Sequence, residues 1–156
     1  MPAEPFSAAG VSFRRAESAD VAGVVALLAD DPLGRSRESL ELAPYLAAFE
    51  AIDADPGQLL LIGESAGRVV ATFQLSFIPG LARGGALRAQ IEAVRVAESA
   101  RGTGLGSAMI EWAIEEARRR GCALVQLTTD KSRVEAHHFY ERLGFVASHE
   151  GMKLGL

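Results

Sequence analysis

The chain has 156 residues, of which 49% are hydrophobic and 23% are charged, and its formal net charge at pH 7 is −4. This length is typical of a single domain, and the composition is that of a globular protein, which excludes wholesale disorder and a coiled coil. The acidic balance argues against nucleic acid as the main partner, because contacts with phosphates require a basic face. No apolar run reaches the roughly 20 residues that a membrane span needs, so we expect no membrane partner.

The N-terminal residues and the cysteine content bear on the cellular compartment of the protein. Residues 1–10, MPAEPFSAAG, lack the basic and apolar regions of a signal peptide, and we expect them to form a flexible tail. The single cysteine, Cys122, has no partner for an internal disulfide. These features predict a cytoplasmic protein whose residues 11–156 form one domain.

The first half of the chain predicts two helices and three strands. A short strand at residues 11–16 precedes a helix that Ser18 can cap. A second helix is expected from Pro44, which fits the first helical turn because its missing N–H costs nothing there. Two strand-like runs follow at residues 58–64 and 68–78, and the Ser-Ala-Gly turn between them predicts an antiparallel hairpin.

The second half predicts a crossover between parallel strands. Residues 87–97 form the next expected strand, the clearest helix of the chain starts near Leu105, and residues 123–130 resemble a buried strand. A final helix from Ser132 and one or two short strands in the last 12 residues complete the chain. We therefore predict an α/β (α+β) fold: a mixed, mostly antiparallel sheet of six to seven strands with one parallel pair, flanked by about four helices.

Three glycines lie between the predicted strand and the clearest helix, in the sequence Arg101-Gly-Thr-Gly-Leu-Gly106. Glycines at such a junction let a ligand approach the backbone closely, and they leave N–H groups directed outward at the positive end of the helix dipole. A phosphate group is the natural ligand for this arrangement. A tight turn without a ligand is the purely structural alternative.

A dinucleotide-binding turn has a similar order of elements, with Asp130 in place of the acidic residue that ends the next strand. However, Ser107 occupies the position of the third glycine in the pattern G-x-G-x-x-G, and only about 26 residues follow Asp130, too few for further parallel strands. A mononucleotide P-loop is excluded because no Gly-Lys-Ser/Thr follows the glycines.

The turn resembles the Arg/Gln-x-x-Gly-x-Gly/Ala signature of the GNAT acetyltransferases (Gcn5-related N-acetyltransferases), and Val94-x-Val96 precedes it as is usual in that family. Residues 136–145, AHHFYERLGF, are similar to a second family element, Ala-x-x-Phe-Tyr-x-x-x-Gly-Phe. Two motifs in the right order are more specific than either alone. The resemblance covers residues 11–156 and implies the single-domain GNAT acyltransferase fold, with the parallel pair of strands splayed apart.

The resemblance also implies that acetyl-CoA is the cosubstrate. The turn would hold the pyrophosphate through backbone amides, Arg101 would add positive charge, and backbone groups of Val94 and Val96 would bind the pantetheine arm. Arg133 stands where relatives often have an asparagine, and it could instead reach a phosphate of the cosubstrate. The complete set of implied binding residues is Val94, Arg95, Val96, Arg101, Gly102, Thr103, Gly104, Leu105, Gly106, Ser107, Arg133 and Phe139.

The expected chemistry needs a base, because an amine is mostly protonated at neutral pH and an ammonium ion cannot attack a thioester. The resemblance implies that Glu92 deprotonates the amine through water and that Tyr140 protonates the departing thiolate of CoA. A solvated or ion-paired Glu92 and a core Tyr140 are the structural alternatives. The adjacent His137 and His138 point different ways on a helix, so we expect no metal.

We predict an N-acetyltransferase that moves the acetyl group of acetyl-CoA to a primary amine of a small molecule or protein, by direct attack in a ternary complex. The alternatives are a sensor module that binds acyl-CoA without turnover and, ranked last, a dinucleotide-binding protein. In the family the acceptor site is built from the segments that correspond to residues 30–39 and 148–153. Arg35 and Arg37 could meet an acidic group there, and the short C-terminal hairpin favours an open site or one completed in a homodimer.

Overall fold

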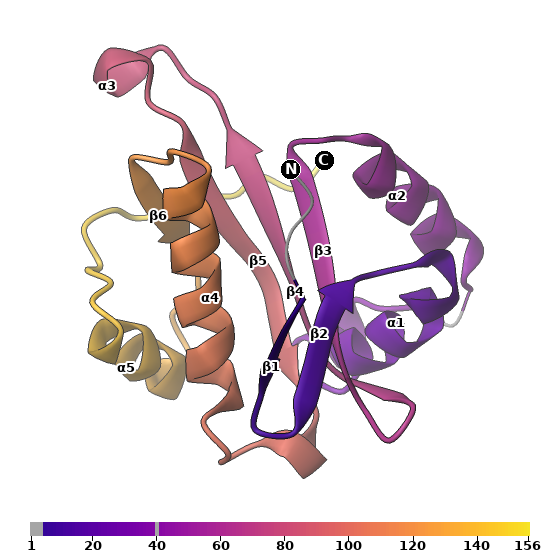
Figure 1. The fold of residues 1–156 in the computed structure, drawn as a ribbon. Helices are drawn as coiled ribbons and strands as arrows, with labels where there is room; N and C mark the ends of the chain where they lie inside the picture. The colour runs from indigo at the N-terminus through magenta and orange to yellow at the C-terminus, as the bar shows by residue number, and fades with distance from the viewer. Residues whose placement is uncertain (1–4, 40) are drawn as a thin grey trace. The chain divides into compact units, whose positions relative to one another are not determined.

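The computed structural model describes residues 5–39 and 41–156 and contains a six-stranded sheet whose strands follow chain order (Figure 1). The strands are β1 (Phe6–Ala8), β2 (Val11–Arg15), β3 (Gln58–Ser65), β4 (Arg68–Ile78), β5 (Arg88–Val96) and β6 (Leu124–Leu127). Strands β1 to β5 pair antiparallel with their neighbours, and β6 lies beside β5 as the parallel member. The predicted mixed sheet with one parallel pair is confirmed.

The helices are α1 (Val21–Ala29), α2 (Ala43–Ala54), α3 (Ala82–Gly85), α4 (Leu105–Arg119) and α5 (Val134–Arg142), with short 3₁₀ turns at Ser18–Asp20, Gly34–Ser36 and Glu98–Ala100. Among the described helices, none combines the length and the apolar character needed to cross a bilayer. By internal packing the chain divides into two compact units, one that ends at Gln126 and one that comprises Leu127–Leu156.

The expectation of a tail at the N-terminus is wrong for residues 6–8, which form β1. The ring of Phe6 stacks on Phe13 with 4.4 Å between centroids and on Trp112 with 4.9 Å. Ala9 and Gly10 both have positive φ, so β1 turns into β2 through a two-residue hairpin loop. The aromatic stack and the hairpin hold this segment in the sheet, whereas residues 1–4 of the expected tail lie outside the described residues.

The one or two strands expected at the C-terminus are not formed, and residues 145–156 contain no helix or strand. Gly151 and Gly155 interrupt this segment, and glycine weakens a strand because it costs backbone entropy and offers no side chain for packing. Met152 and Leu154 are 95% and 86% exposed, so burial does not stabilise an extended conformation here.

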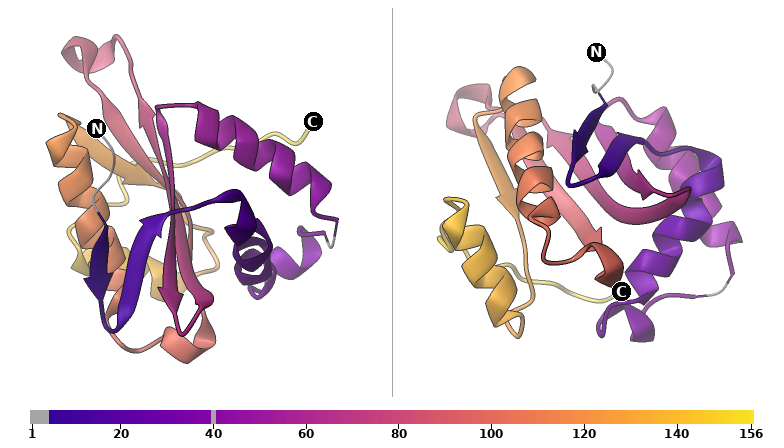
Figure 2. Two further views of the ribbon diagram at one scale, coloured as in Figure 1. Left: turned by 45° about the vertical axis from the view of Figure 1, so that its right-hand side comes forward. Right: turned by 60° about the horizontal axis from the view of Figure 1, so that its bottom comes forward.

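The two faces of the sheet carry different side chains because residues alternate between faces along each strand. On one face, Leu61, Phe73 and Leu75 are almost completely buried, and Phe73 contacts Trp112 of α4 edge-to-face. On the opposite face, Ile62 packs in a core cluster with residues of α1 and α2. Figure 2 shows the same division, with α4 on one face of the sheet and α1 and α2 on the other.

An ion pair joins β2 to the start of α1. The guanidinium of Arg14 donates to both carboxylate oxygens of Asp20, at 2.7 and 2.9 Å, and the Glu17 N–H donates to Asp20 at 2.7 Å. The hydrogen bond from Arg14 holds the pKa of the Asp20 carboxyl below its ordinary value near 3.8, although partial burial opposes this shift. The ionised carboxylate therefore stabilises the fold above about pH 4, and this stabilisation is lost as the pH falls through the folded-state pKa.

We expect Asp20→Asn to lower the free energy of unfolding at pH 7 by about 1–3 kcal/mol, because it removes the charge from a largely buried carboxylate that accepts hydrogen bonds from Arg14 and from the Glu17 N–H. Urea unfolding from pH 7 to pH 2 should show the difference from the wild type shrinking below pH 4. Asp53→Asn is the matched control, since the exposed Asp53 lies 3.5 Å from Arg15 and should contribute less than about 0.5 kcal/mol. A difference at Asp20 that stays constant across this pH range would contradict the assignment.

Candidate active site

The glycine turn before α4 adopts a backbone conformation that favours glycine. Gly102 and Gly104 have φ values of 75° and 80°, in the left-handed region that favours glycine, and α4 begins at Leu105 directly after them. A Cβ at either glycine would find no other atom within 4 Å, so the side of the turn that lacks side chains is open. Thr103 closes the turn by donating its hydroxyl hydrogen to the Ala100 carbonyl at 2.7 Å.

The turn presents a run of hydrogen-bond donors. Arg101 N–H bonds to the Glu98 carbonyl, and the first helical bond is donated by Ala108 N–H to the Gly104 carbonyl. Between them, the N–H groups of residues 102–107 make no hydrogen bond to another residue in the described part of the chain. These donors lie at the positive end of the 15-residue helix α4, which is where an anion is most stabilised. The turn therefore fits the diphosphate that the family resemblance implies.

Strand β5 contains a bulge immediately after Glu92. In the pairing with β4, Glu92 lies opposite Gln74 and Arg95 lies opposite Thr72, so β5 uses one more residue than β4 over this interval. The extra residue is accommodated by Ala93, whose φ of 50° is unusual for a residue other than glycine. Glu92 is exposed and ends the regular part of the strand. No sequence signal marked the bulge, because alanine has no preference for this conformation.

The carbonyls of Val94 and Val96, which the resemblance assigns to the pantetheine arm, each accept a hydrogen bond from an arginine. Arg95 Nη1 donates to the Val94 carbonyl at 2.9 Å, and Arg101 Nε donates to the Val96 carbonyl at 3.0 Å. A carbonyl oxygen has two lone pairs, so each retains one for a ligand. Arg101 thus fastens the glycine turn to the end of β5.

The side chain of Arg95 is directed to the loop after α1. Arg95 Nε lies 3.2 Å from Asp31 Oδ2, and both side chains are largely buried. Asp31 Oδ1 also accepts the Leu33 N–H at 3.0 Å. Three residues after Asp31, a Cβ at Gly34 would collide with the Leu28 carbonyl oxygen, so the loop passes too close to α1 for any side chain there. The expected acceptor segment, residues 30–39, is therefore anchored at its start to β5, a contact that the sequence did not predict.

The second unit, residues 127–156, contains the remaining predicted site residues. Tyr140 and Phe139 are half-buried on α5, and the Tyr140 ring contacts Phe139 and Phe145 edge-to-face at 5.0 and 5.7 Å. Arg133 is exposed at the N-terminal end of α5. The helix begins at Val134, and Ser132 bonds to the Asp130 carboxylate. The roles of Tyr140, Phe139 and Arg133 toward the first unit stay predictions.

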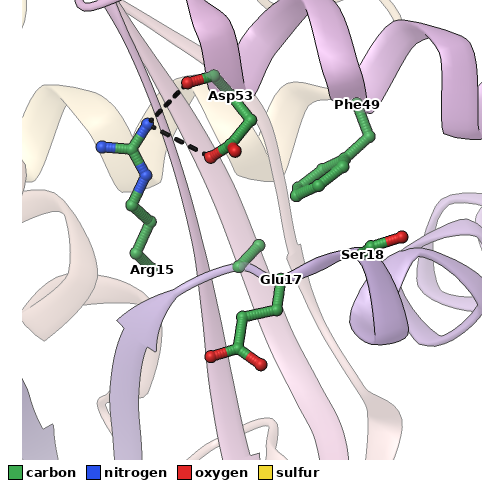
Figure 3. Close-up of a pocket in the computed structure, with 6 residues that line it drawn as sticks. Arg15, Glu17, Ser18, Phe49 and Asp53 are labelled. Carbon is green, nitrogen blue, oxygen red and sulfur yellow. Dashed lines mark hydrogen bonds and ion pairs between the residues drawn. The ribbon is translucent and has the colours of Figure 1, made fainter.

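A shallow pocket of about 370 Å³ lies elsewhere in the first unit, at the junction of β2 and α2 (Figure 3). Its lining residues are Arg15, Ala16, Glu17, Ser18, Phe49 and Asp53. Arg15 pairs with Asp53 across it, at 3.5 Å between Nη2 and Oδ1. None of the predicted site residues lines this pocket, and its Arg15 and Asp53 pair with each other, so it is not the candidate site.

The described residues support neither a nucleophilic cysteine nor a metal centre. Burial raises the pKa of the Cys122 thiol, which disfavours the thiolate that a nucleophilic cysteine needs. Within residues 5–39 and 41–156, no group of three or more His, Cys, Asp or Glu side chains is placed to hold a metal ion.

The chain matches known acetyltransferases in sequence and a solved structure in fold. The model of the Acetyltransferase (GNAT) family matches residues 21–145. A crystal structure described as a transcriptional regulator from Bacillus halodurans C-125 is 46% identical, superposes with a TM-score of 0.90, and is matched over 94% of this chain and 99% of that one.

Two characterised enzymes match over shorter stretches. Glucosamine 6-phosphate N-acetyltransferase of Trypanosoma brucei brucei is 40% identical over 90 residues, which are 58% of this chain and 59% of that protein. Aminoalkylphosphonate N-acetyltransferase of Salmonella typhimurium is 42% identical over 60 residues, 38% of this chain and 39% of that protein. The matched regions thus span less than two thirds of either enzyme. Together with the bulged strand, the glycine turn and the match over residues 21–145, these similarities show that the chain belongs to the acetyltransferase (GNAT) family.

Proposed function

We propose that this protein is an N-acetyltransferase that transfers the acetyl group of acetyl-CoA to a primary amine. The observation that carries the proposal is the row of N–H groups at residues 102–107, which have no acceptor in the described chain and lie at the positive end of α4. This row is suited to a diphosphate. Arg101 supplies additional positive charge beside it, and β5 leads from this turn back to Glu92.

Acetyl-CoA supplies the activated thioester, and the protein must supply a base for the incoming amine. Glu92 lies four residues before Val96 on the strand that would flank the pantetheine arm, and its carboxylate is exposed. An exposed carboxylate is a weak base for an ammonium ion, so we propose that Glu92 takes the proton through an ordered water as the amine attacks. A backbone N–H of the bulge, such as that of Val94, would stabilise the negative charge on the thioester oxygen.

Proton delivery to the leaving thiolate is assigned to Tyr140. The reference pKa values of phenol and thiol, about 10 and 8.5, are close enough for such a transfer. The Tyr140 ring packs edge-to-face against Phe139 and Phe145, and these contacts support the ring that carries the hydroxyl. Direct attack in a ternary complex requires both groups, and no covalent enzyme intermediate is needed.

A small-molecule acceptor is favoured over a protein. Both characterised relatives are named for small amines that carry a phosphate or phosphonate group. The segment after Asp31 exposes Arg35 and Arg37, and Arg37 is held by a hydrogen bond of 3.0 Å from its Nε to the Leu33 carbonyl. Guanidinium groups bind such anions well, so this segment would suit an amine with an acidic group.

The second candidate function is an acyl-CoA sensor without turnover. The solved relative that is 46% identical is described as a transcriptional regulator, which favours a binding role for that protein. A sensor needs the glycine turn but not Glu92 or Tyr140, so variants of these residues separate the two functions.

We expect Gly104→Ala to raise the KM for acetyl-CoA about tenfold or more, because the new Cβ occupies the open side of the turn and disfavours a φ of 80°. Gly121→Ala is the matched control, since Gly121 also has positive φ and open space around its Cβ but lies at the other end of α4. Steady-state kinetics and a thermal shift with acetyl-CoA provide the measurement. Equal effects of the two variants on KM would refute the diphosphate site.

Glu92→Gln should lower kcat by about 10²- to 10⁴-fold while leaving the KM for acetyl-CoA unchanged, because the amide cannot accept the proton. The rate of this variant should recover as the pH approaches the pKa of the amine, where free amine is abundant. CoA release measured from pH 6 to pH 10 tests both points. Glu111→Gln, an exposed glutamate on α4, is the control, and an unchanged kcat in Glu92→Gln would exclude Glu92 as the base.

Tyr140→Phe should lower kcat by about 10²-fold or more through loss of the proton donor. The variant keeps the ring, so contacts with Phe139 and Phe145 and the melting temperature should be preserved. If kcat falls only in proportion to a loss of folded protein, measured by circular dichroism, Tyr140 has a packing role and the acid lies elsewhere.

A further inference from the structure

All side-chain amides of the protein lie on one face of its sheet. The sequence contains four glutamines and no asparagine. Gln58, Gln74, Gln90 and Gln126 occupy β3, β4, β5 and β6, one on each of four adjacent strands. Together with Ser76 they form a group that we name the amide belt.

The register of the strands places the belt on a common face. Ser76 lies opposite Gln58 on one side and opposite Gln90 on the other, and residues directly opposite each other point to the same face. Gln74 is two residues from Ser76 and therefore shares that face. Gln126 reaches the same row from β6, because its Nε2 donates to Gln90 Oε1 at 2.6 Å.

The belt is internally hydrogen-bonded but not saturated. Gln58 Oε1 accepts from Gln74 Nε2 and from Ser76 Oγ, both at 2.8 Å. Within residues 5–39 and 41–156, the amide nitrogens of Gln58 and Gln90 and the amide oxygens of Gln74 and Gln126 have no hydrogen-bond partner in the protein. The mutual bonds couple the two amides of each pair, Gln58 with Gln74 and Gln90 with Gln126, so each pair presents one free amide nitrogen and one free amide oxygen.

Glu92 lies at the edge of this row. It is two residues beyond Gln90 on β5 and directly opposite Gln74 on β4, so it shares the face of the belt. The belt side chains are all half-buried, and Glu92 is exposed. Further along the same face, Ile62 is completely buried by α1 and α2. The face thus changes from an apolar core to a polar, partly open floor next to the proposed base.

The chemistry of the belt selects among acceptor classes. An anionic group would require donors alone, and it would be repelled by the amide oxygens of Gln74 and Gln126. An apolar amine would cover these amides and leave them unsatisfied, at a cost of about 1–3 kcal/mol for each group. A hydroxyl group both donates and accepts, so a row of hydroxyls matches the free amide nitrogens and oxygens.

We propose that the amide belt is the floor of the acceptor site and selects a primary amine rich in neutral hydroxyl groups, of the amino-sugar type, with its amino group presented to Glu92. This inference rests on the proposed acetyltransferase function. It assigns the hydroxyl-bearing body of the acceptor to the belt and leaves any acidic substituent to the segment that carries Arg35 and Arg37.

The test compares glucosamine with cyclohexylamine, which has an amino group on a six-membered ring but no hydroxyls. CoA release is measured at equal concentrations of free amine. We expect kcat/KM for glucosamine to exceed that for cyclohexylamine at least tenfold, and Gln58→Leu and Gln90→Leu each to reduce this ratio about tenfold through the KM for the amine. Equal kcat/KM values for the two amines in the wild type would overturn the inference.

Controls separate recognition from folding. Because every glutamine belongs to the belt, the matched pair uses serine: Ser76→Ala should reduce the ratio, whereas Ser12→Ala, at an exposed position of β2, should not. The thermal shift produced by acetyl-CoA should be retained in all four variants, which shows that each is folded. If belt variants lower the rates for both amines by the same factor, the belt only stabilises the sheet and the inference is wrong.

Failure of the proposed function gives a different result. If acetyl-CoA stabilises the protein but no amine releases CoA, the transferase proposal fails. The belt is then tested by thermal shift with glucosamine or cyclohexylamine in the presence of CoA. A shift with glucosamine alone that is lost in Gln58→Leu supports the belt as a ligand site of a sensor, and equal shifts with both amines refute it.

Discussion

The extra residue in β5 is the constraint on which the arrangement of the site depends. Before the bulge, β5 follows the regular alternation and places Glu92 beside Gln74. After it, Arg95 is aligned with Thr72, and the strand continues to the carbonyl that Arg101 holds. A strand without the left-handed Ala93 would present the residues from 94 onward to the opposite faces, because a shift of one residue inverts the alternation. The conformation of Ala93 thus sets how Glu92, before the bulge, is oriented relative to the strand that leads into the glycine turn.

The two faces of the sheet have different roles: one is packed for stability, and the other carries polar side chains of the candidate site. The face under α4 is apolar and packed, with Phe73 and Leu75 fully buried, and it supplies the rigidity that a catalytic geometry requires. The opposite face holds an apolar cluster below α1 and α2 and, beyond it, polar side chains that are only half-buried. Helix α4 serves both roles, because its buried stripe supports the sheet while its N-terminus carries the N–H groups of the turn, which have no acceptor among the described residues.

Local patterns in the sequence predicted the parts of this protein that depend on local chemistry. The turn residues predicted the hairpin of β3 and β4. Helical spacing predicted helix α4, and the three glycines predicted the turn before it. The bulge at Ala93 could not be predicted, since it arises from pairing with β4 and alanine gives no sign of it. The pair of Arg95 and Asp31 joins residues 64 positions apart, and β1 depends on Phe6 meeting Trp112. Such contacts exist only after the chain has folded. The expected C-terminal strands do not form, because residues 146–156 are exposed and no burial stabilises an extended conformation there.

The anchoring of Asp31 bears on how acceptor preference can diverge among related chains. The ion pair with Arg95 and the close approach at Gly34 fix the course of the loop at two positions. The exposed side chains of Arg35 and Arg37 extend from this fixed base, to which Arg37 adds one hydrogen bond, from its Nε to the Leu33 carbonyl. Replacing them changes the charge offered to a substrate while the backbone path stays the same. Single substitutions can therefore exchange this basic recognition surface for a neutral or acidic one, with no need to rebuild the scaffold beneath.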